Sequence, residues 1–527
     1  MTKKLLSCAL ALMMLLSLCS MPAVAEDSIY PLVDEPITIK GVIFKDNIDA
    51  SHPRIVWTEL AKLTGITVEW TAVSTDQKAV FLAAGEWPDF FHNGFDSTLC
   101  EEYGTQAGML VNLNDYAEYM PHMNKLFDSF QNSRKCCTSS NGAMYSLPYF
   151  NQSTTAANCR WHFRYDLIEA AGKEIPTTID EYYDVLVAIK KMTGAAPLAD
   201  KLAPKHGYQT SASGEWFHFA AFGTATNPNF DDAGDGTVIY NRTSDQYRYY
   251  LQFMNKLYAE GLLHQEYLTL DNTTRRALIE EGKTAFGADA WGNVSNAAVF
   301  TNGFADLRQL APLTSQYDDT RTLAGYPPAK SGGAVINANS EYVKEICQLL
   351  DIFYATEEVA EGTGLHGQVS TYGPEGITWE FTNEEKTEWE YILPEGYDQT
   401  GTVYQTSEVI LSNNFGAHIA LAKAFNGAMS NGRARQMGFV ENLIPYQGDV
   451  QFPAGNMSFN EDEMNVISLY QTEIYSYVDE WNAWFIAGIK NPNSDADWDE
   501  YIKGFEKMGL QELIEAYQTA YTRYLAM

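Results

Sequence analysis

Aromatic side chains with polar neighbours are the residues whose types and spacing could do chemistry in this sequence. Residues 160–165 alternate Arg, Trp, His, Phe, Arg and Tyr. An extended strand would put three aromatic rings on one face and three nitrogen-bearing side chains on the other. Further candidates follow expected strands or lie in Gly-rich loops: His92, Asn93, Tyr149, Asn151, Trp216, Trp291 and Tyr372. Such groups can stack on a flat ligand and hydrogen-bond its rim, and core packing is the alternative for each aromatic residue.

Signatures of catalysis are missing. The sequence contains no HExxH, GxSxG or GxxxxGK[ST] motif, and no GxGxxG follows an expected strand. The 68 acidic residues leave a glycosidase-type carboxylate pair open, although no spacing marks one. The residues therefore favour non-covalent binding over bond-breaking chemistry.

Metal and disulfide sites are not expected either. The acidic run at 231–236 lacks an acid at its third position and a Glu at the twelfth, so it predicts a hairpin turn and no calcium loop. Five cysteines follow the N-terminal segment, and none has the spacing of a metal site: Cys100, Cys136, Cys137, Cys159 and Cys347. We expect mostly buried thiols, and no cofactor.

The elements that must position these side chains begin as an alternation of strands and helices. Strands are predicted at 37–44, 66–71 and 89–92, with helices at 53–64 and 76–84 between them. This order predicts a parallel sheet covered by helices. After 150 a new strand is expected at 158–165, then helices at 166–171, 179–192 and 244–260, a strand at 283–288 and a hairpin at 371–392. Thr178 and Glu181 form a predicted capping box for the second of these helices.

Charge and the N-terminus indicate where the protein works. A net charge of −33 excludes nucleic acid and anionic lipid as partners. Residues 1–25 resemble a signal peptide, with Lys3 and Lys4 before a short apolar stretch and an Ala-Val-Ala cleavage site ending at Ala25. Lipidation at Cys19 is the alternative to this cleavage. Either way the protein is expected on the extracellular side of the membrane.

Several ordered motifs resemble one family. They are LTGITVE at 63–69, AAGEWPD at 83–89, NGAMYSLP at 141–148, IPTTIDE at 175–181, NKLYAEGL at 255–262, EGKTA at 281–285 and YGPEG at 372–376. Each is weak alone, but their order is similar to that of family 1 extracellular solute-binding proteins. The long, lipoprotein-type sugar-binding subunits of bacterial ABC importers share this order.

The resemblance implies an α/β fold of the two-lobed periplasmic-binding-protein type (type II), with several hinge crossings. The first lobe would hold 28–150 and 286–336, and the second 151–285 and 337–527. The implied function is capture of a carbohydrate, of oligosaccharide size, and its delivery to ABC permease subunits by a monomeric, non-catalytic protein. A secreted carbohydrate-active enzyme or a surface sugar-sensing or adhesion protein is the alternative.

The same resemblance places the ligand between the lobes, at strand ends and loops. The implied contacts are His92, Asn93, Tyr149, Asn151, Trp161, Arg164, Trp216, Trp291 and Tyr372. Arg164 has a second interpretation, as the partner of Asp166 in an ion pair.

Overall fold

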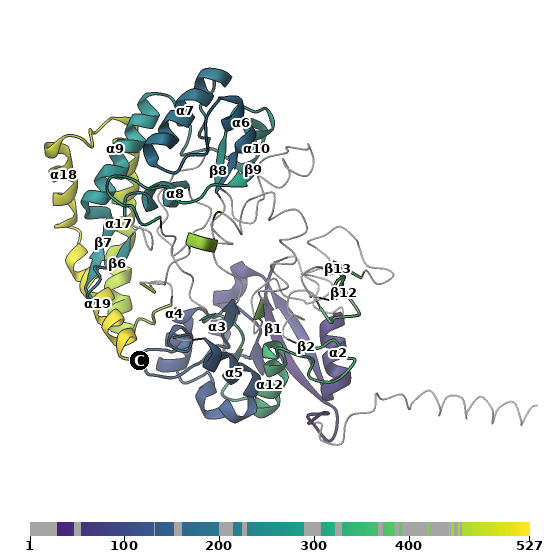
Figure 1. The fold of residues 1–527 in the computed structure, drawn as a ribbon. Helices are drawn as coiled ribbons and strands as arrows, with labels where there is room; N and C mark the ends of the chain where they lie inside the picture. Colours follow the sequence, from purple (N-terminus) through teal and green to yellow (C-terminus); the bar gives the residue numbers. More distant parts are fainter. Residues whose placement is uncertain are drawn as a thin grey trace, which may run out of the picture.

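The helices and strands of the chain form two groups in a computed structural model (Figure 1). The structure describes residues 29–46, 54–130, 132–151, 161–199, 214–223, 229–288, 307–321, 329–366, 373–384, 389–392, 419–420, 442, 444–446, 452–453 and 456–527. We call the group around the N-terminal sheet the first lobe and the group above it in Figure 1 the second lobe.

The first lobe is built on a four-stranded sheet with the order β11-β3-β1-β2. Its strands are β1 (Ile37–Phe44), β2 (Ile66–Val73), β3 (Phe90–Phe91) and β11 (Val335–Ile336). β2 and β3 run parallel to β1, and β11 is antiparallel to β3. The helices between the strands are α2 (Ile55–Thr64) and α3 (Lys78–Ala84). The predicted alternation of strands and helices is confirmed to within a few residues.

Side chains that alternate along these strands divide the first lobe into two cores. Ile39, Ile43 and Phe90 pack on one face with α2, α5 (Pro121–Ser129) and α12 (Val343–Asp351). Val42 and Phe91 belong to a smaller core on the other face. Because both faces are covered there, the second half of β1 (Gly41–Phe44) and the strands β3 and β11 are buried at every residue.

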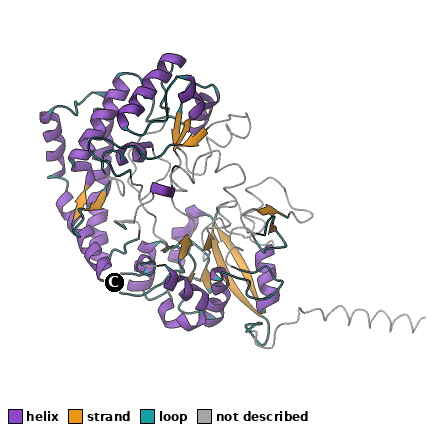
Figure 2. Cartoon of the chain, in the orientation of Figure 1, coloured by secondary structure: helices purple, strands orange, loops and turns teal. Residues whose placement is uncertain are grey.

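The second lobe has a three-stranded sheet with β5 (Trp161–Arg164) between β8 (Phe286–Ala288) and β9 (Leu307–Gln309). Both neighbours are antiparallel to β5. Helices supply most of the lobe (Figure 2), among them α6 (Tyr165–Ala170), α7 (Ile179–Thr193), α8 (Gly214–Ala220), α9 (Asp245–Ala259), α10 (Asn272–Glu280), α17 (Glu461–Ala487), α18 (Asp495–Phe505) and α19 (Leu510–Ala526). The predicted capping box of α7 is present, with Thr178 and Glu181 bonded reciprocally.

Strand pairs are found in two stretches that were predicted to be hairpins. β6 (Phe230–Asp232) and β7 (Val238–Tyr240) pair as a hairpin around the acidic run. β12 (Trp379–Phe381) and β13 (Trp389–Tyr391) pair within the predicted hairpin at 371–392. Among the described residues, no helix combines the length and apolarity that crossing a bilayer requires.

Two adjacent strands connect the lobes. β4 (Tyr149–Asn151) leaves the first lobe and pairs antiparallel with β10 (Ala329–Lys330), by which the chain returns. A short strand, β14 (Ile419–Ala420), pairs with β4 on its other side. The Tyr354 hydroxyl donates to the Pro148 carbonyl oxygen over 2.7 Å, which ties the start of the crossing to the first lobe.

The predicted lobe boundaries need correction in two places. Residues 286–336 were assigned to the first lobe, but within this range β8 and β9 pair with β5, and Leu310 and Leu313 lie in the second-lobe core. Residues from 337 onward were assigned to the second lobe, but α12 and the chain as far as Leu365 pack in the first-lobe core. Strand pairing decides to which lobe β8 and β9 belong, and the apolar face of α12 decides to which lobe that helix belongs.

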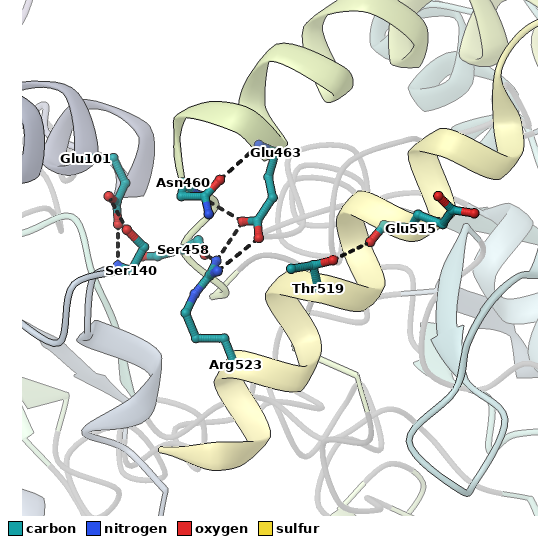
Figure 3. A network of polar contacts seen from close by, with 8 residues as sticks. All are labelled: Glu101, Ser140, Ser458, Asn460, Glu463, Glu515, Thr519 and Arg523. Carbon is teal, nitrogen blue, oxygen red and sulfur yellow. Dashed lines mark hydrogen bonds and ion pairs between the residues drawn. The ribbon is translucent and has the colours of Figure 1, made fainter.

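The C-terminal helix is bonded to the start of α17 in its own lobe (Figure 3) and also contacts the first lobe through Tyr524. Arg523 of α19 donates to both carboxylate oxygens of Glu463 over 2.9 and 2.6 Å and to the Ser458 carbonyl oxygen over 2.7 Å. Glu463 also forms a capping box with Asn460 at the start of α17. The next residue, Tyr524, packs against both lobe cores, and its hydroxyl lies 3.5 Å from the Cys136 sulfur.

Candidate functional site

The carboxyl end of β3 carries His92, one of the predicted ligand residues. Its backbone N–H donates to the Val42 carbonyl oxygen over 2.9 Å, so the strand pairing continues through this residue. Alternation puts the ring on the same face as Phe90. Burial lowers the pKa of His92 to about 4, so the imidazole is neutral near physiological pH. Ligands of open α/β folds bind outside the carboxyl ends of strands, where this residue lies.

Two tryptophans surround this imidazole. The ring centroids of Trp57, from α2, and Trp70, from β2, lie 5.7 and 5.6 Å from that of His92. The two indoles are 4.8 Å apart. Trp70 can lie over β1 because residue 41 is a glycine, whose added Cβ would meet the indole at 2.8 Å. We call these three rings the aromatic triad.

Each ring of the aromatic triad has a nitrogen without a hydrogen-bond partner. Trp57 Nε1, Trp70 Nε1 and His92 Nδ1 are all buried, and no bond to them is found in the structure. A buried polar group without a partner destabilises a protein by about 1–3 kcal/mol, so such groups are rare and cluster at functional sites. Three on adjacent rings indicate a place where oxygen atoms of a ligand could bind.

Lys45 lies at the same edge of the sheet as the aromatic triad. It follows β1 and its backbone N–H donates to the Val73 carbonyl oxygen over 2.9 Å, so alternation places its side chain on the face of Ile43 and His92. The ammonium nitrogen is buried without a hydrogen-bond partner, and burial lowers its pKa. This edge therefore combines a cationic donor with neutral donors.

Asn93 has a different environment from its neighbour His92. Its side-chain oxygen accepts from the Phe44 N–H over 2.9 Å, and its amide nitrogen donates to the Phe44 carbonyl oxygen over 3.1 Å. The carboxamide thus copies a backbone pairing and extends the contact between β1 and β3. Its polar atoms stabilise the strand ends.

Two predicted residues lie in the crossing strand β4. Tyr149 is half-buried, and the Lys330 ammonium lies 5.1 Å from its ring centroid, within the range of a cation–π contact. The Asn151 backbone pairs with Ala420 of β14. Both residues thus lie where the chain passes between the lobes.

In the second lobe Arg164 is buried and bonded to protein groups. Its guanidinium forms a bidentate ion pair with Asp166, and Nη1 donates to the Ile279 carbonyl oxygen over 3.0 Å. The ion-pair interpretation of the sequence is therefore the one that the structure shows. Trp161 begins β5, and its backbone pairs with Ala288 of β8.

For three predicted residues the structure does not describe the side chain. Trp216 was expected in a loop, but Gly214–Ala220 is helical, and Phe217 and Phe219 of this helix pack in the second-lobe core. Trp291 and Tyr372 lie outside the described residues.

Some candidate residues were missed by the sequence analysis. No sequence motif includes Lys45, Trp57 or Trp70. The only pattern that indicates that their side chains lie close together is the alternation of β1 and β2 around Gly41. Among the described residues, no group of three or more His, Cys, Asp or Glu side chains could hold a metal ion. Cys100, Cys136, Cys137 and Cys347 are buried free thiols, as expected, and Cys159 lies outside the described residues.

Comparisons with known proteins agree with this architecture. A family model described as bacterial extracellular solute-binding protein matches residues 46–360. The fructooligosaccharide ABC transporter substrate-binding protein FusA of Streptococcus pneumoniae is 24% identical over 524 residues, covering 95% of this chain and 93% of that protein. Lipoprotein LipO of Bacillus subtilis is 24% identical over 251 residues, covering 45% of this chain and 46% of that protein.

Solved structures with similar folds extend over the same length. A solute-binding protein from Bifidobacterium longum infantis, described as HMO-binding and ABC-transporter-associated, has a TM-score of 0.68 at 18% identity and covers 93% of this chain and 99% of its own. FusA of Streptococcus pneumoniae in complex with kestose has a TM-score of 0.66 at 20% identity, covering 93% of this chain and 100% of that chain. These likenesses confirm the predicted two-lobed α/β fold.

Proposed function

The chain belongs to the bacterial extracellular solute-binding proteins, and from that premise we propose that it captures an oligosaccharide between its two lobes and delivers it to an ABC transporter. The observation that carries this proposal is the relationship to FusA, which runs over nearly the full length of both chains. The role is binding and delivery, without chemical change of the ligand.

The physical character of the first-lobe edge supports a sugar as ligand. Sugars present hydroxyl groups around the ring and C–H patches on its faces, so their sites combine hydrogen-bonding groups with aromatic surfaces. The aromatic triad supplies both in one place. Its nitrogens bear no full charge near neutral pH, which suits an uncharged hydroxyl oxygen.

The proposed ligand contacts extend the predicted set. His92 is joined by Trp57, Trp70 and Lys45, whose polar atoms are buried without partners. The proposed contacts at the crossing and in the second lobe are Tyr149, Asn151, Trp161, Trp216, Trp291 and Tyr372. Asn93 and Arg164 support their strands in this proposal, because their polar atoms already have protein partners.

Export follows from the same family. We propose that residues 1–25 direct secretion and that the mature protein works at the outer face of the membrane, as a monomer beside its permease. Cleavage after Ala25 or lipidation at Cys19 would both place it there. Mass spectrometry of the protein from its own host distinguishes a chain beginning at Glu26 from one beginning at a diacylated Cys19.

Calorimetry tests the function directly. Titration of the mature protein with kestose, longer fructooligosaccharides, a milk trisaccharide and an alginate trisaccharide should give saturable binding of at least one sugar. Chromatography after prolonged incubation should then return that sugar unchanged. Appearance of shorter products would favour a carbohydrate-active enzyme, and absence of binding to every class of oligosaccharide would contradict the proposal.

A further inference from the structure

Gln309, at the end of β9, is a buried residue whose side-chain amide makes no hydrogen bond to any described residue. The residue is fully buried, with 0% exposure. In the part of the chain that the structure describes, neither the oxygen nor the nitrogen of its carboxamide has a hydrogen-bond partner. Its backbone is well bonded, since the carbonyl oxygen accepts from the Tyr165 hydroxyl over 3.1 Å and from the Asn442 amide over 2.8 Å.

This combination is unusual for a glutamine. A carboxamide can donate two hydrogen bonds and accept two, and burial without any of them costs several kcal/mol in principle. An apolar residue of the same length would avoid that cost, so packing alone does not account for the amide. The half-buried Gln518 shows the ordinary arrangement: its oxygen accepts from the Val238 N–H over 2.7 Å and its nitrogen donates to the Gly236 carbonyl oxygen over 2.9 Å.

The position of Gln309 in the sheet indicates what could use its amide. Gln309 pairs with His162, at the start of β5, and Trp161 pairs with Ala288, at the end of β8. β5 is the first strand after the crossing strand β4. Gln309 therefore lies at the end of the sheet where the chain enters from the first lobe, and Figure 2 draws this sheet on the side of the second lobe that faces the first.

We propose that the Gln309 carboxamide binds two adjacent hydroxyl groups of one sugar ring, its oxygen accepting from one and its nitrogen donating to the other. This inference rests on the proposed function and adds a second-lobe contact to it. The donor and acceptor of a carboxamide lie side by side in one plane, which matches the spacing of vicinal hydroxyls. Gln309 is then a specificity residue, because a sugar lacking one of the two hydroxyls would leave half of the amide unpaired.

The replacement Gln309→Met tests this role, because Met has a similar length and no hydrogen-bonding amide. We expect the affinity for the oligosaccharide that binds best in calorimetry to fall by about tenfold or more. The melting temperature of the unliganded protein should stay the same or rise by about 1–2 °C, since the unpaired amide is gone. The matched control Gln518→Met should do the reverse, lowering the melting temperature and leaving affinity unchanged.

The outcomes separate this inference from the function on which it rests. Unchanged affinity in a well-folded Gln309→Met protein would overturn the role of Gln309 alone. A variant that melts well below the wild type, or does not fold, would show that the amide supports the unliganded protein and would overturn it too. Failure of the wild-type protein to bind any oligosaccharide would overturn the proposed function.

Discussion

The two lobes hold their polar side chains at the facing sheet edges in different ways. At the first-lobe edge, three ring nitrogens of the aromatic triad and the Lys45 ammonium are buried without partners. In the second lobe, the buried Arg164 is bonded to Asp166 and Ile279, whereas the Gln309 amide is unpaired. Under the proposed function, a place at a strand end does not by itself make a residue a ligand contact. The hydrogen bonds that it already makes are the better guide.

The same contrast appears between neighbours in the sequence. His92 and Asn93 follow the same strand, but the asparagine amide is satisfied by Phe44 and the histidine Nδ1 is not. Buried polar groups nearly always have partners in native proteins. If the unpaired atoms await a ligand, replacing them should change affinity more than stability, and replacing the paired groups should do the opposite.

The largest expected effect is on stability, at Arg164. Replacement with Met removes a buried bidentate ion pair and leaves the Ile279 carbonyl oxygen without its donor. We expect a loss of about 2–4 kcal/mol in the free energy of unfolding, measured by urea denaturation, with sugar affinity retained. Asp166→Asn is the control for the ion pair alone and should cost less. A large loss of affinity with unchanged stability would place Arg164 among the ligand contacts after all.

The next effect is a pH dependence from His92. Burial lowers its pKa in the folded protein to about 4, below the ordinary value of 6.5. Between these values the unfolded chain takes up a proton that the folded protein excludes, so stability falls as the pH is lowered. The loss should approach about 3 kcal/mol near pH 4. His92→Phe should remove this part of the pH dependence, and urea denaturation at several pH values measures it.

A comparison of the wild type with His92→Phe over the same range of pH sharpens this prediction. Above the unfolded pKa of the histidine both states are neutral, so no titration difference from this residue remains. Equal pH slopes for wild type and His92→Phe would show that the imidazole is accessible to protons in the folded protein. That result would also argue against a dry, unpaired ring.

A smaller effect is expected on affinity at Trp70. Replacement with Phe keeps an aromatic ring over Gly41 and removes the indole N–H. Loss of one neutral hydrogen bond should weaken sugar binding by about 3- to 10-fold, or about 0.5–1.5 kcal/mol. Trp498, buried in the second lobe beside Phe485, is a matched control, and Trp498→Phe should leave affinity unchanged. Equal effects of both replacements would remove Trp70 from the site.

The sequence predicted the elements of both lobes better than their division. Strand and helix patterns are local, and the capping box of α7 and the parallel strands formed as expected. The boundary at 286 depends on which sheet β8 pairs with, and the boundary at 336 depends on which core α12 packs in. Both are determined by residues far away in the chain, which a local pattern does not reveal. The unpaired nitrogens of Trp57 and Trp70 could not be foreseen, because a missing hydrogen bond has no sequence pattern.

The smallest expected effect concerns metal, at the acidic hairpin between β6 and β7. Its carboxylates follow the pattern of the paired groups: Asp232 accepts from the N–H groups of Gly234 and Gly236 over 2.7 and 2.9 Å and from the Tyr521 hydroxyl over 2.7 Å. Asp235 accepts from the Thr237 N–H over 3.0 Å. Oxygens that already accept these hydrogen bonds are poorly placed to coordinate a calcium ion, which needs six to eight oxygen ligands.

The melting temperature of the protein should therefore agree within about 1 °C between excess calcium and excess chelator, since a metal bound only to the folded state would raise it by mass action. A drop of many degrees in chelator would show that paired carboxylates at this turn exchange their partners for a metal, and that existing hydrogen bonds are a weaker guide to binding sites than the two lobes suggest.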